Sequence, residues 1–209
     1  MSDYTISVTN NSGESVQVAI YQTYPDIDGL PLVWLLQQIP DGNTNSLSWE
    51  INWALNWGTT PQQLIPGVQW TSGGPVQNMD PTGSSGNNAM GITFQNGQFV
   101  TSPTAFYDKT VQPGNMQVAT DGSFTVKDSR AMSLAVYTNS LAAFVMAGQP
   151  NGTYLFETHP TYWICTTQHK QGVTVSGTFV TNPLEMQFTA GTTTLNYVLD
   201  DTLTFVPQN

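Results

Sequence analysis

Apolar and polar residues alternate along most of this chain, with the two-residue period of half-buried β-strands. Near the start, Tyr4, Ile6 and Val8 alternate with hydroxyl residues, and the alternation resumes at 16–20 after the turn sequence Asn-Asn-Ser-Gly. These two segments predict a β-hairpin. A longer alternation at 47–57 predicts an extended strand with one apolar face.

The remaining segments complete an all-β pattern. The continuous apolar run at 32–36 predicts a central strand covered on both faces, and Asn96-Gly97 predicts a tight hairpin turn. Several short strands follow at the turn spacing typical of sandwiches and barrels. No window shows a helical period sustained over three turns. We therefore predict one antiparallel β-sandwich domain over 1–209, jelly-roll or immunoglobulin-like, with little or no helix and a long polar loop near 71–91.

The composition adds an unusual surface to this fold. Hydrophobic residues make up 39% of the 209 residues, which is enough for a substantial core. Charged residues make up only 9%, against roughly 25% in ordinary globular domains. Solubility must therefore rest on Asn, Gln, Ser, Thr and Gly. Such a surface tolerates close contact with another copy of the chain or with a sugar.

The net charge of −10 excludes several classes of partner. Only Lys109, Lys127, Arg130 and Lys170 are basic, so the clustered cations that bind nucleic acids or anionic lipids are missing. The apolar runs are too short for a membrane span. The first residues have neither a basic n-region nor an apolar h-region. We therefore expect a cytoplasmic protein, or one exported without an N-terminal signal peptide.

Candidate catalytic residues are few. In an extended strand Cys165 and His169 would lie about 13 Å apart, and no cysteine-protease signature surrounds the thiol. The chain contains no CxxC or HxxxH pair for zinc and no phosphate or dinucleotide fingerprint. We therefore predict no catalytic site and no cofactor. An exposed Cys165 would instead cross-link neighbouring copies, and an enzyme of unrecognised type would have His159 as its base.

One segment matches part of a calcium loop. Asp41, Asn43 and Asn45 have the spacing of the first three ligands of an EF-hand, but Ser46 stands where the loop needs Gly and Asn52 stands where it needs the bidentate Glu. Asp-Gly-Asn is also an ordinary turn sequence. The three residues are candidate metal ligands, with turn formation as the alternative.

The tryptophans suggest a different kind of site. Trp57 ends an alternating segment, and Trp70 precedes the polar segment 71–91, which includes Asp80 and Asn87. Aromatic rings stack on the C–H faces of sugars, while amide and carboxylate groups bond to the hydroxyls. These four residues are therefore the candidate ligand-binding residues, with loop packing as the alternative for the two rings.

Two stretches, at 4–22 and 147–175, resemble a family of short bacterial and fungal β proteins. The first ends its strand in Asn-Asn-Ser-Gly, and the second has a Gln-Pro-Asn…Tyr-x-Phe…His-Pro-x-Tyr-Trp pattern. Together they cover under a quarter of the chain. The resemblance implies a cytosolic or inclusion-type β protein outside the established enzyme families. It transfers no catalytic residues.

Three functions remain open at this point. The first is a non-catalytic protein that acts through its surface, by self-association as a homo-oligomer or by docking a partner. The second is a lectin-like module that binds carbohydrate. The third is an enzyme of unrecognised type.

Overall fold

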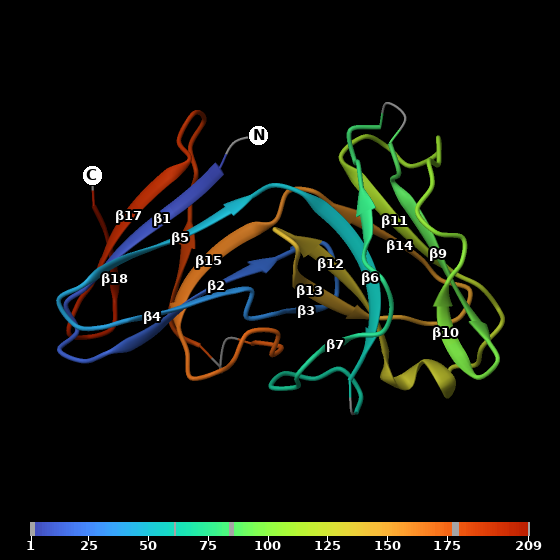
Figure 1. Ribbon diagram of the computed structural model, residues 1–209, viewed down its shortest axis with the longest axis horizontal. Helices are drawn as coiled ribbons and strands as arrows, with labels where there is room; N and C mark the ends of the chain where they lie inside the picture. The colour runs from blue at the N-terminus through green and yellow to red at the C-terminus, as the bar shows by residue number, and fades with distance from the viewer. Residues whose placement is uncertain (1–2, 61, 84–85, 177–179, 209) are drawn as a thin grey trace.

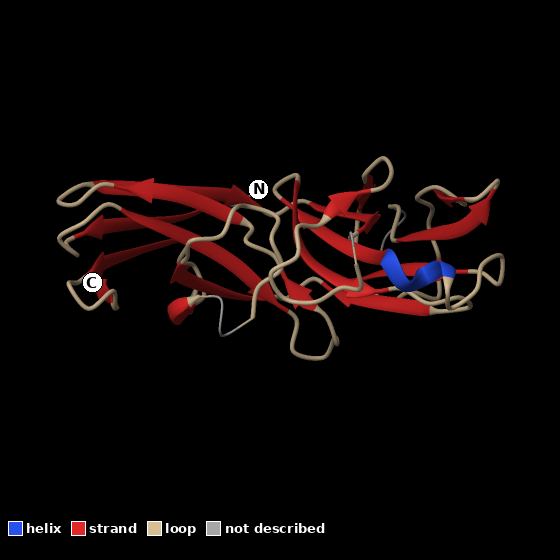
Figure 2. Cartoon of the chain, turned by 90° about the horizontal axis from the view of Figure 1, so that it is seen from below, coloured by secondary structure: helices blue, strands red, loops and turns tan. Residues whose placement is uncertain are grey.

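The computed structural model describes residues 3–60, 62–83, 86–176 and 180–208. It confirms the all-β prediction: the described chain contains strands and a single short 3-10 helix, η1 (Asp128–Ala131). The strands form four sheets that pack as two pairs, side by side along the long axis of the molecule (Figure 1). The view from below shows the layered strands, with η1 in the half away from the C-terminus (Figure 2).

The first sheet pair consists of sheets I and II. Sheet I contains β18 (Phe205–Gln208), β17 (Thr194–Leu199), β1 (Asp3–Asn10) and β5 (Thr44–Glu50), in that order. Sheet II contains β16 (Thr181–Met186), β15 (Thr161–Thr166), β2 (Val16–Thr23) and β4 (Leu35–Ile39). All pairings are antiparallel except the parallel pair β1–β17.

The second sheet pair consists of sheets III and IV. Sheet III contains β3 (Leu30–Pro31), β13 (Leu141–Ala147), β12 (Met132–Thr138), β6 (Trp53–Thr59) and β7 (Thr71–Ser72), with β8 (Gln77–Met79) also paired to β6. Sheet IV contains β10 (Gln98–Thr101), β9 (Ala89–Gln95), β11 (Asn115–Thr120) and β14 (Thr153–Glu157). Here β9 and β11 are parallel.

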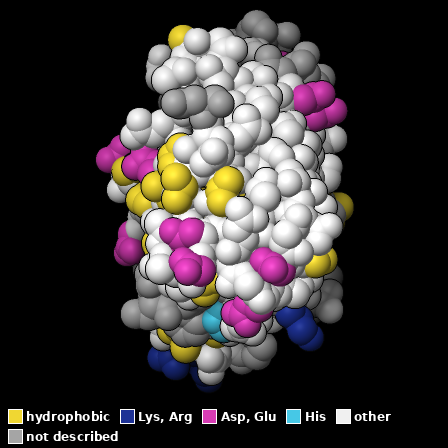
Figure 3. All heavy atoms as spheres, turned by 90° about the vertical axis from the view of Figure 1, so that its left-hand side faces the viewer, with side chains coloured by type: hydrophobic (Ala, Val, Ile, Leu, Met, Phe, Trp, Pro, Cys, Tyr) yellow, Lys and Arg dark blue, Asp and Glu magenta, His cyan; other side chains and the backbone are white. Residues whose placement is uncertain are grey.

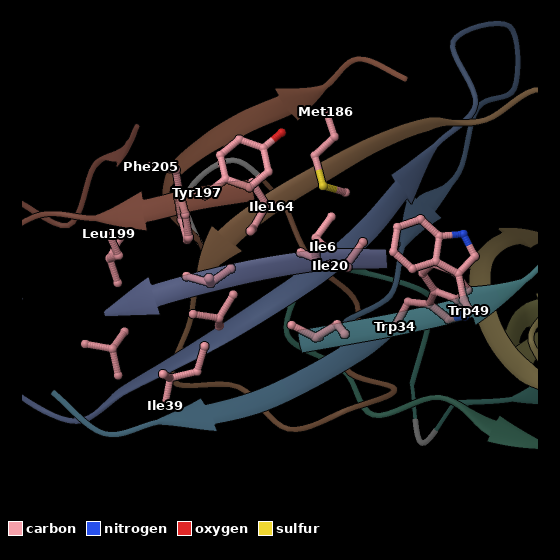
Figure 4. Packing of buried hydrophobic residues seen from close by; sticks show 14 of the residues in the cluster. Ile6, Ile20, Trp34, Ile39, Trp49, Ile164, Met186, Tyr197, Leu199 and Phe205 are labelled. Atoms are coloured by element: carbon pink, nitrogen blue, oxygen red, sulfur yellow. The ribbon is translucent and has the colours of Figure 1, made fainter. Parts of the chain in front are cut away.

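Each sheet pair encloses its own apolar core. Alternate residues of β1 and β2, such as Ile6 and Ile20, point between sheets I and II and are fully buried. Figure 4 shows this core with Trp34 and Trp49 together at one end. The second core lies between sheets III and IV and includes Leu55. The prediction of a single domain over 1–209 stays a prediction.

Three local predictions have different outcomes. The Asn96-Gly97 turn joins β9 to β10 with positive φ at both residues, 53° and 81°, as a tight hairpin requires. The hairpin predicted from 4–8 and 16–20 is wrong, because β1 pairs with β17 and β5 in sheet I while β2 lies in sheet II. The polar segment 71–91 contains β7, β8 and the start of β9.

The chain crosses between the sheet pairs at four links. They join β2 to β3, β3 to β4, β5 to β6 and β14 to β15. The alternation at 47–57 is therefore two strands, and Ile51 between them packs against both cores. A buried hydrogen-bond network adds to this junction: Gln22 donates to the Thr138 hydroxyl at 2.8 Å, and the Trp34 indole donates to the Thr138 carbonyl at 3.0 Å.

Candidate functional site

A groove of about 580 Å³ opens where the two sheet pairs meet. We call it the junction groove. Four segments form its walls: the start of β1, the β5–β6 link, the β14–β15 link with the start of β15, and the segment from the end of β16 onward. The lining residues are Tyr4, Ile51, Thr158, His159, Pro160, Thr161, Tyr162, Glu185, Met186, Gln187 and Phe188. Ligand pockets form preferentially at such boundaries between packed units.

Three half-buried aromatic rings line this groove. Strand pairing sets Tyr4 opposite Trp49, and the two rings stack at 5.7 Å between centroids. Phe188 packs at nearly a right angle to Tyr4, with 4.9 Å between centroids, and Tyr162 lies 5.4 Å from Trp49. Trp49 itself is buried against Trp34. The rings of the groove therefore rest on a rigid part of the first core.

Polar groups stand beside these rings. His159, Glu185 and Gln187 are exposed, and their side chains make no hydrogen bond within the described part of the chain. Burial raises the pKa of the Tyr162 phenol, and the neighbouring Trp49 side chain offsets this only in part. The phenol is thus protonated at neutral pH and can donate a hydrogen bond. Trp49 Nε1 has no partner of normal hydrogen-bond geometry among the described residues.

A second groove, of about 780 Å³, adjoins the first. We call it the β8 groove. Its walls are Ile51, Asn52, Trp53, Ala54, Val76, Asn78, Met79, Asp80, Pro81, Thr82 and Ser140. A third hollow of about 360 Å³ is lined mainly by Gln, Thr and Ser with His169, and the described residues of its wall include no Phe, Tyr or Trp. Both grooves at the junction, by contrast, combine aromatic rings with polar groups.

The two tryptophans proposed from the sequence lie in the interior. Trp57 and Trp70 are only 7% and 6% exposed, so the expectation of exposed stacking rings is wrong. Trp70 donates from its indole to the Ser133 hydroxyl at 2.8 Å. The backbone of Gly73 lies so close to the Trp57 ring that no Cβ would fit. Both rings anchor the start of the polar segment against sheet III, as edge aromatics commonly do.

Asp80 and Asn87 lie at the base of the same segment. The Asp80 amide donates to the Asn87 carbonyl at 2.6 Å, and Asp80 Oδ1 accepts from the Thr82 amide and hydroxyl at 3.1 and 2.6 Å. The hydrogen bonds from Thr82 lower the pKa of the Asp80 carboxyl. Asp80 also lines the β8 groove, whereas the exposed Asn87 lines neither groove. Of the four residues proposed from the sequence, the structure therefore brings Asp80 and Asn87 together, and Trp57 and Trp70 are not part of this contact.

The calcium candidates are occupied with turn contacts. Asp41 Oδ1 accepts from the Gly13 amide at 2.9 Å, the Asn43 amide group donates to the Asp41 carbonyl at 3.0 Å, and Asn45 donates to the Gln38 carbonyl at 3.3 Å. Over the described ranges, no three His, Cys, Asp or Glu side chains gather as a metal site. Turn formation accounts for these residues.

Cys165 is fully buried on β15, and its Sγ lies 3.8 Å from the Ala19 carbonyl oxygen. Burial raises the pKa of this thiol to about 12, so it stays protonated at neutral pH. A thiol in this state is neither accessible nor nucleophilic. The cross-link through Cys165 was expected only for an exposed thiol, and this condition is not met. His159, the base considered for an enzyme, is exposed on the wall of the junction groove.

The rings of the junction groove were missed by the sequence reasoning. Tyr4, Tyr162 and Phe188 come from three distant segments, and each reads as an ordinary apolar strand position. The packing of sheet I, which contains β1, on sheet II, which contains β15 and β16, brings them together around the first core. No spacing within one segment signals such a site.

Within the described residues, no helix has the length and hydropathy needed to cross a membrane. A family model described as RhiA matches residues 1–209, so the chain belongs to the RhiA family. No curated protein and no solved structure matches the chain.

Proposed function

We propose that this RhiA-family protein is a non-catalytic, lectin-like protein that binds carbohydrate in the junction groove. The observation that carries the proposal is the set of half-buried rings next to polar groups without partners. Sugars have apolar C–H faces that pack on rings and hydroxyl edges that need hydrogen bonds. The groove offers Tyr4, Tyr162 and Phe188 for the first need, and Glu185, Gln187 and the Tyr162 phenol for the second.

The negative charge of the chain and of the groove limits the class of sugar that can bind. The chain carries a net charge of −10, and the described residues that line the groove include the acid Glu185 and no Lys or Arg. Anionic sugars such as uronates would be repelled, because like charges across an interface cost free energy. The proposed ligand is therefore a neutral glycan.

The groove favours binding over hydrolysis. Glycoside hydrolases generally flank the scissile bond with two carboxyl groups. Among the described residues that line the junction groove, Glu185 is the only one that carries a carboxyl group. Cys165, the one thiol, is buried away from the groove. These features support a binding role.

The test is a glycan screen followed by titration of the tryptophan fluorescence, since Trp49 lies directly beneath the groove rings. We expect a neutral glycan to bind, and we expect Gln187→Ala and Phe188→Ala each to lower its affinity about tenfold, or about 1.4 kcal/mol. The matched control is Gln98→Ala, an exposed position on β10. Unchanged affinity in both groove variants, or no glycan bound, would refute the proposal.

Self-association is a second candidate function, favoured by the outer face of sheet I. That face carries hydroxyl residues, and Thr5 bonds to Ser48 at 3.0 Å while Thr9 bonds to Thr44 at 2.7 Å across β1 and β5. On the end of the molecule seen in Figure 3, acidic side chains are scattered over an otherwise largely uncharged surface. Light scattering over a wide concentration range should then show a growing molar mass that reductant does not change. A constant 22.8 kDa would refute this candidate.

A further inference from the structure

The junction groove does not end at the junction. Ile51 lies in its wall and also in the wall of the β8 groove. This half-buried side chain packs against both cores and belongs to the walls of both grooves. A ligand that leaves one groove over Ile51 therefore enters the other.

The β8 groove repeats the chemistry of the junction groove. Its floor is apolar, with Trp53 and Met79 from β6 and β8, and the exposed Val76 extends this surface. Polar groups stand around it: the side-chain amide of Asn78 makes no hydrogen bond within the described part of the chain, and Asp80 presents a carboxylate. A C–H face and hydroxyl edges would find the same two kinds of contact as in the first groove.

We propose, as an extension of the carbohydrate-binding function above, that the ligand is a linear neutral oligosaccharide that lies in both grooves and crosses Ile51. The cavities of about 580 and 780 Å³ each fall within the usual size of a small-ligand pocket, so each holds its own part of the chain. Glu185 in one groove and Asp80 in the other disfavour an anionic chain along its whole length.

Two linked contacts on one ligand strengthen each other, because the second contact forms at a high effective concentration once the first has formed. Affinity must therefore rise with chain length until the ligand reaches the β8 groove. The natural ligand is unidentified, so the probes are neutral cello-, chito- and manno-oligosaccharides from disaccharide to octasaccharide, titrated by calorimetry.

We expect the octasaccharide of the binding series to bind at least about tenfold more tightly than the disaccharide. Asn78→Ala should remove most of that gain while leaving disaccharide affinity unchanged. Val76→Trp, at a position that is 41% exposed and so tolerates a larger side chain, should fill the groove and do the same. The control is Asn196→Ala, an exposed asparagine on β17.

Three results would overturn this inference. If the disaccharide and octasaccharide bind equally, while Gln187→Ala weakens both, the ligand is confined to the junction groove and the proposed function survives alone. If the affinity rises with length but neither Asn78→Ala nor Val76→Trp reduces the gain, the longer chain leaves by another route. Absence of binding at every length would overturn the proposed function as well.

Discussion

The cores of the two sheet pairs are built from different kinds of side chain. The first is rich in β-branched residues, including Ile6, Val18, Ile20, Ile39 and Ile164. The second contains methionines and phenylalanines, namely Met79, Met90, Met116, Met132, Phe124, Phe144 and Phe156. β-Branched side chains have few rotamers, whereas methionine is flexible and fills irregular gaps. The same strand alternation thus builds one core of well-defined shape and one that adapts.

The sheets and loops around the two cores differ as well, and those of the first pair are the more regular. Sheet I has a regular outer face, and its strand β1 pairs over six residues with β17 and over seven with β5. The second pair includes the short strands β7 and β8, and Asp–Thr and Asp–Ser turns hold its loops. The junction between the pairs is buried and polar, around Thr138. The contrast predicts how the molecule should respond when each part is damaged.

The largest effect is expected from Trp34→Ala. Trp34 is fully buried in the first core and donates to the Thr138 carbonyl of the second pair. Removing it should cost about 3–5 kcal/mol of unfolding free energy through the cavity it leaves. Because it links both pairs, we expect calorimetry to show one transition that moves as a whole.

Trp163→Ala is the control, since Trp163 lies on the outer side of sheet II and is partly exposed. It should cost less than Trp34→Ala. Two separate transitions, of which Trp34→Ala shifts one, would show that the pairs unfold independently. That result would contradict the prediction of a single domain over 1–209.

The next effect concerns the polar junction itself. Thr138→Val keeps the side-chain shape but leaves the buried Gln22 amide group without its acceptor at 2.8 Å. We expect a loss of about 1–3 kcal/mol, which is the usual penalty for such an orphaned group. Chemical denaturation should measure it, with the exposed Thr194→Val on β17 as a control that changes stability by less than about 0.5 kcal/mol. Equal effects of the two substitutions would show that the junction contributes nothing.

A smaller effect on unfolding free energy should distinguish the packing of the two cores directly. Ile20→Leu in the first core and Met116→Leu in the second both place leucine at a fully buried site. Volume-conserving swaps usually cost less than about 1.5 kcal/mol. We expect Ile20→Leu to lie near that limit and Met116→Leu to lie well below it, because the second core adapts. Denaturation midpoints at equal m-values provide the comparison, and the reverse order would contradict it.

The strand pattern and the tight turns could be predicted from the sequence, but the assignment of strands to sheets could not. The alternation at 47–57 continues unbroken while Trp49 enters the first core and Trp53 enters the second. The run 32–36 was predicted as one central strand, but residues 32–34 link β3 of sheet III to β4 of sheet II, and the run's last two residues begin β4. Periodicity reports which side of a strand is buried. It carries no information on which core receives that side.

The candidate site shows the same limit. Trp70 has polar neighbours in the sequence, yet it is buried because the chain folds it against Tyr137, with 5.9 Å between centroids. The glycine at 73 lets the backbone lie on the Trp57 ring. Conversely, Tyr4 and Phe188 look like ordinary strand residues and line a groove. Exposure is decided by tertiary packing, which local composition does not contain.

The smallest effect on stability is expected from a change in pH, and it should act mainly on the second sheet pair. In the second pair, hydrogen bonds from Thr or Ser lower the pKa of four carboxyl groups, those of Asp80, Asp108, Asp121 and Asp128. In the first pair, such hydrogen bonds lower the pKa of one, Asp200. A lowered folded-state pKa stabilises the fold above the unfolded value of about 3.9. This stabilisation is lost as the pH falls through the lower folded value.

Asp121→Asn should therefore reduce the loss of stability between pH 7 and pH 3, because the carboxylate that accepts from the Ser123 amide and hydroxyl no longer titrates. The control is Asp26→Asn, an exposed carboxylate that accepts no hydrogen bond within the described part of the chain. Hydrogen exchange at both pH values should place the early acid-induced opening near the loops of sheet IV. Opening that begins instead at the β17–β18 turn, where Asp200 accepts from Thr202 and Thr204, would reverse the comparison between the two pairs.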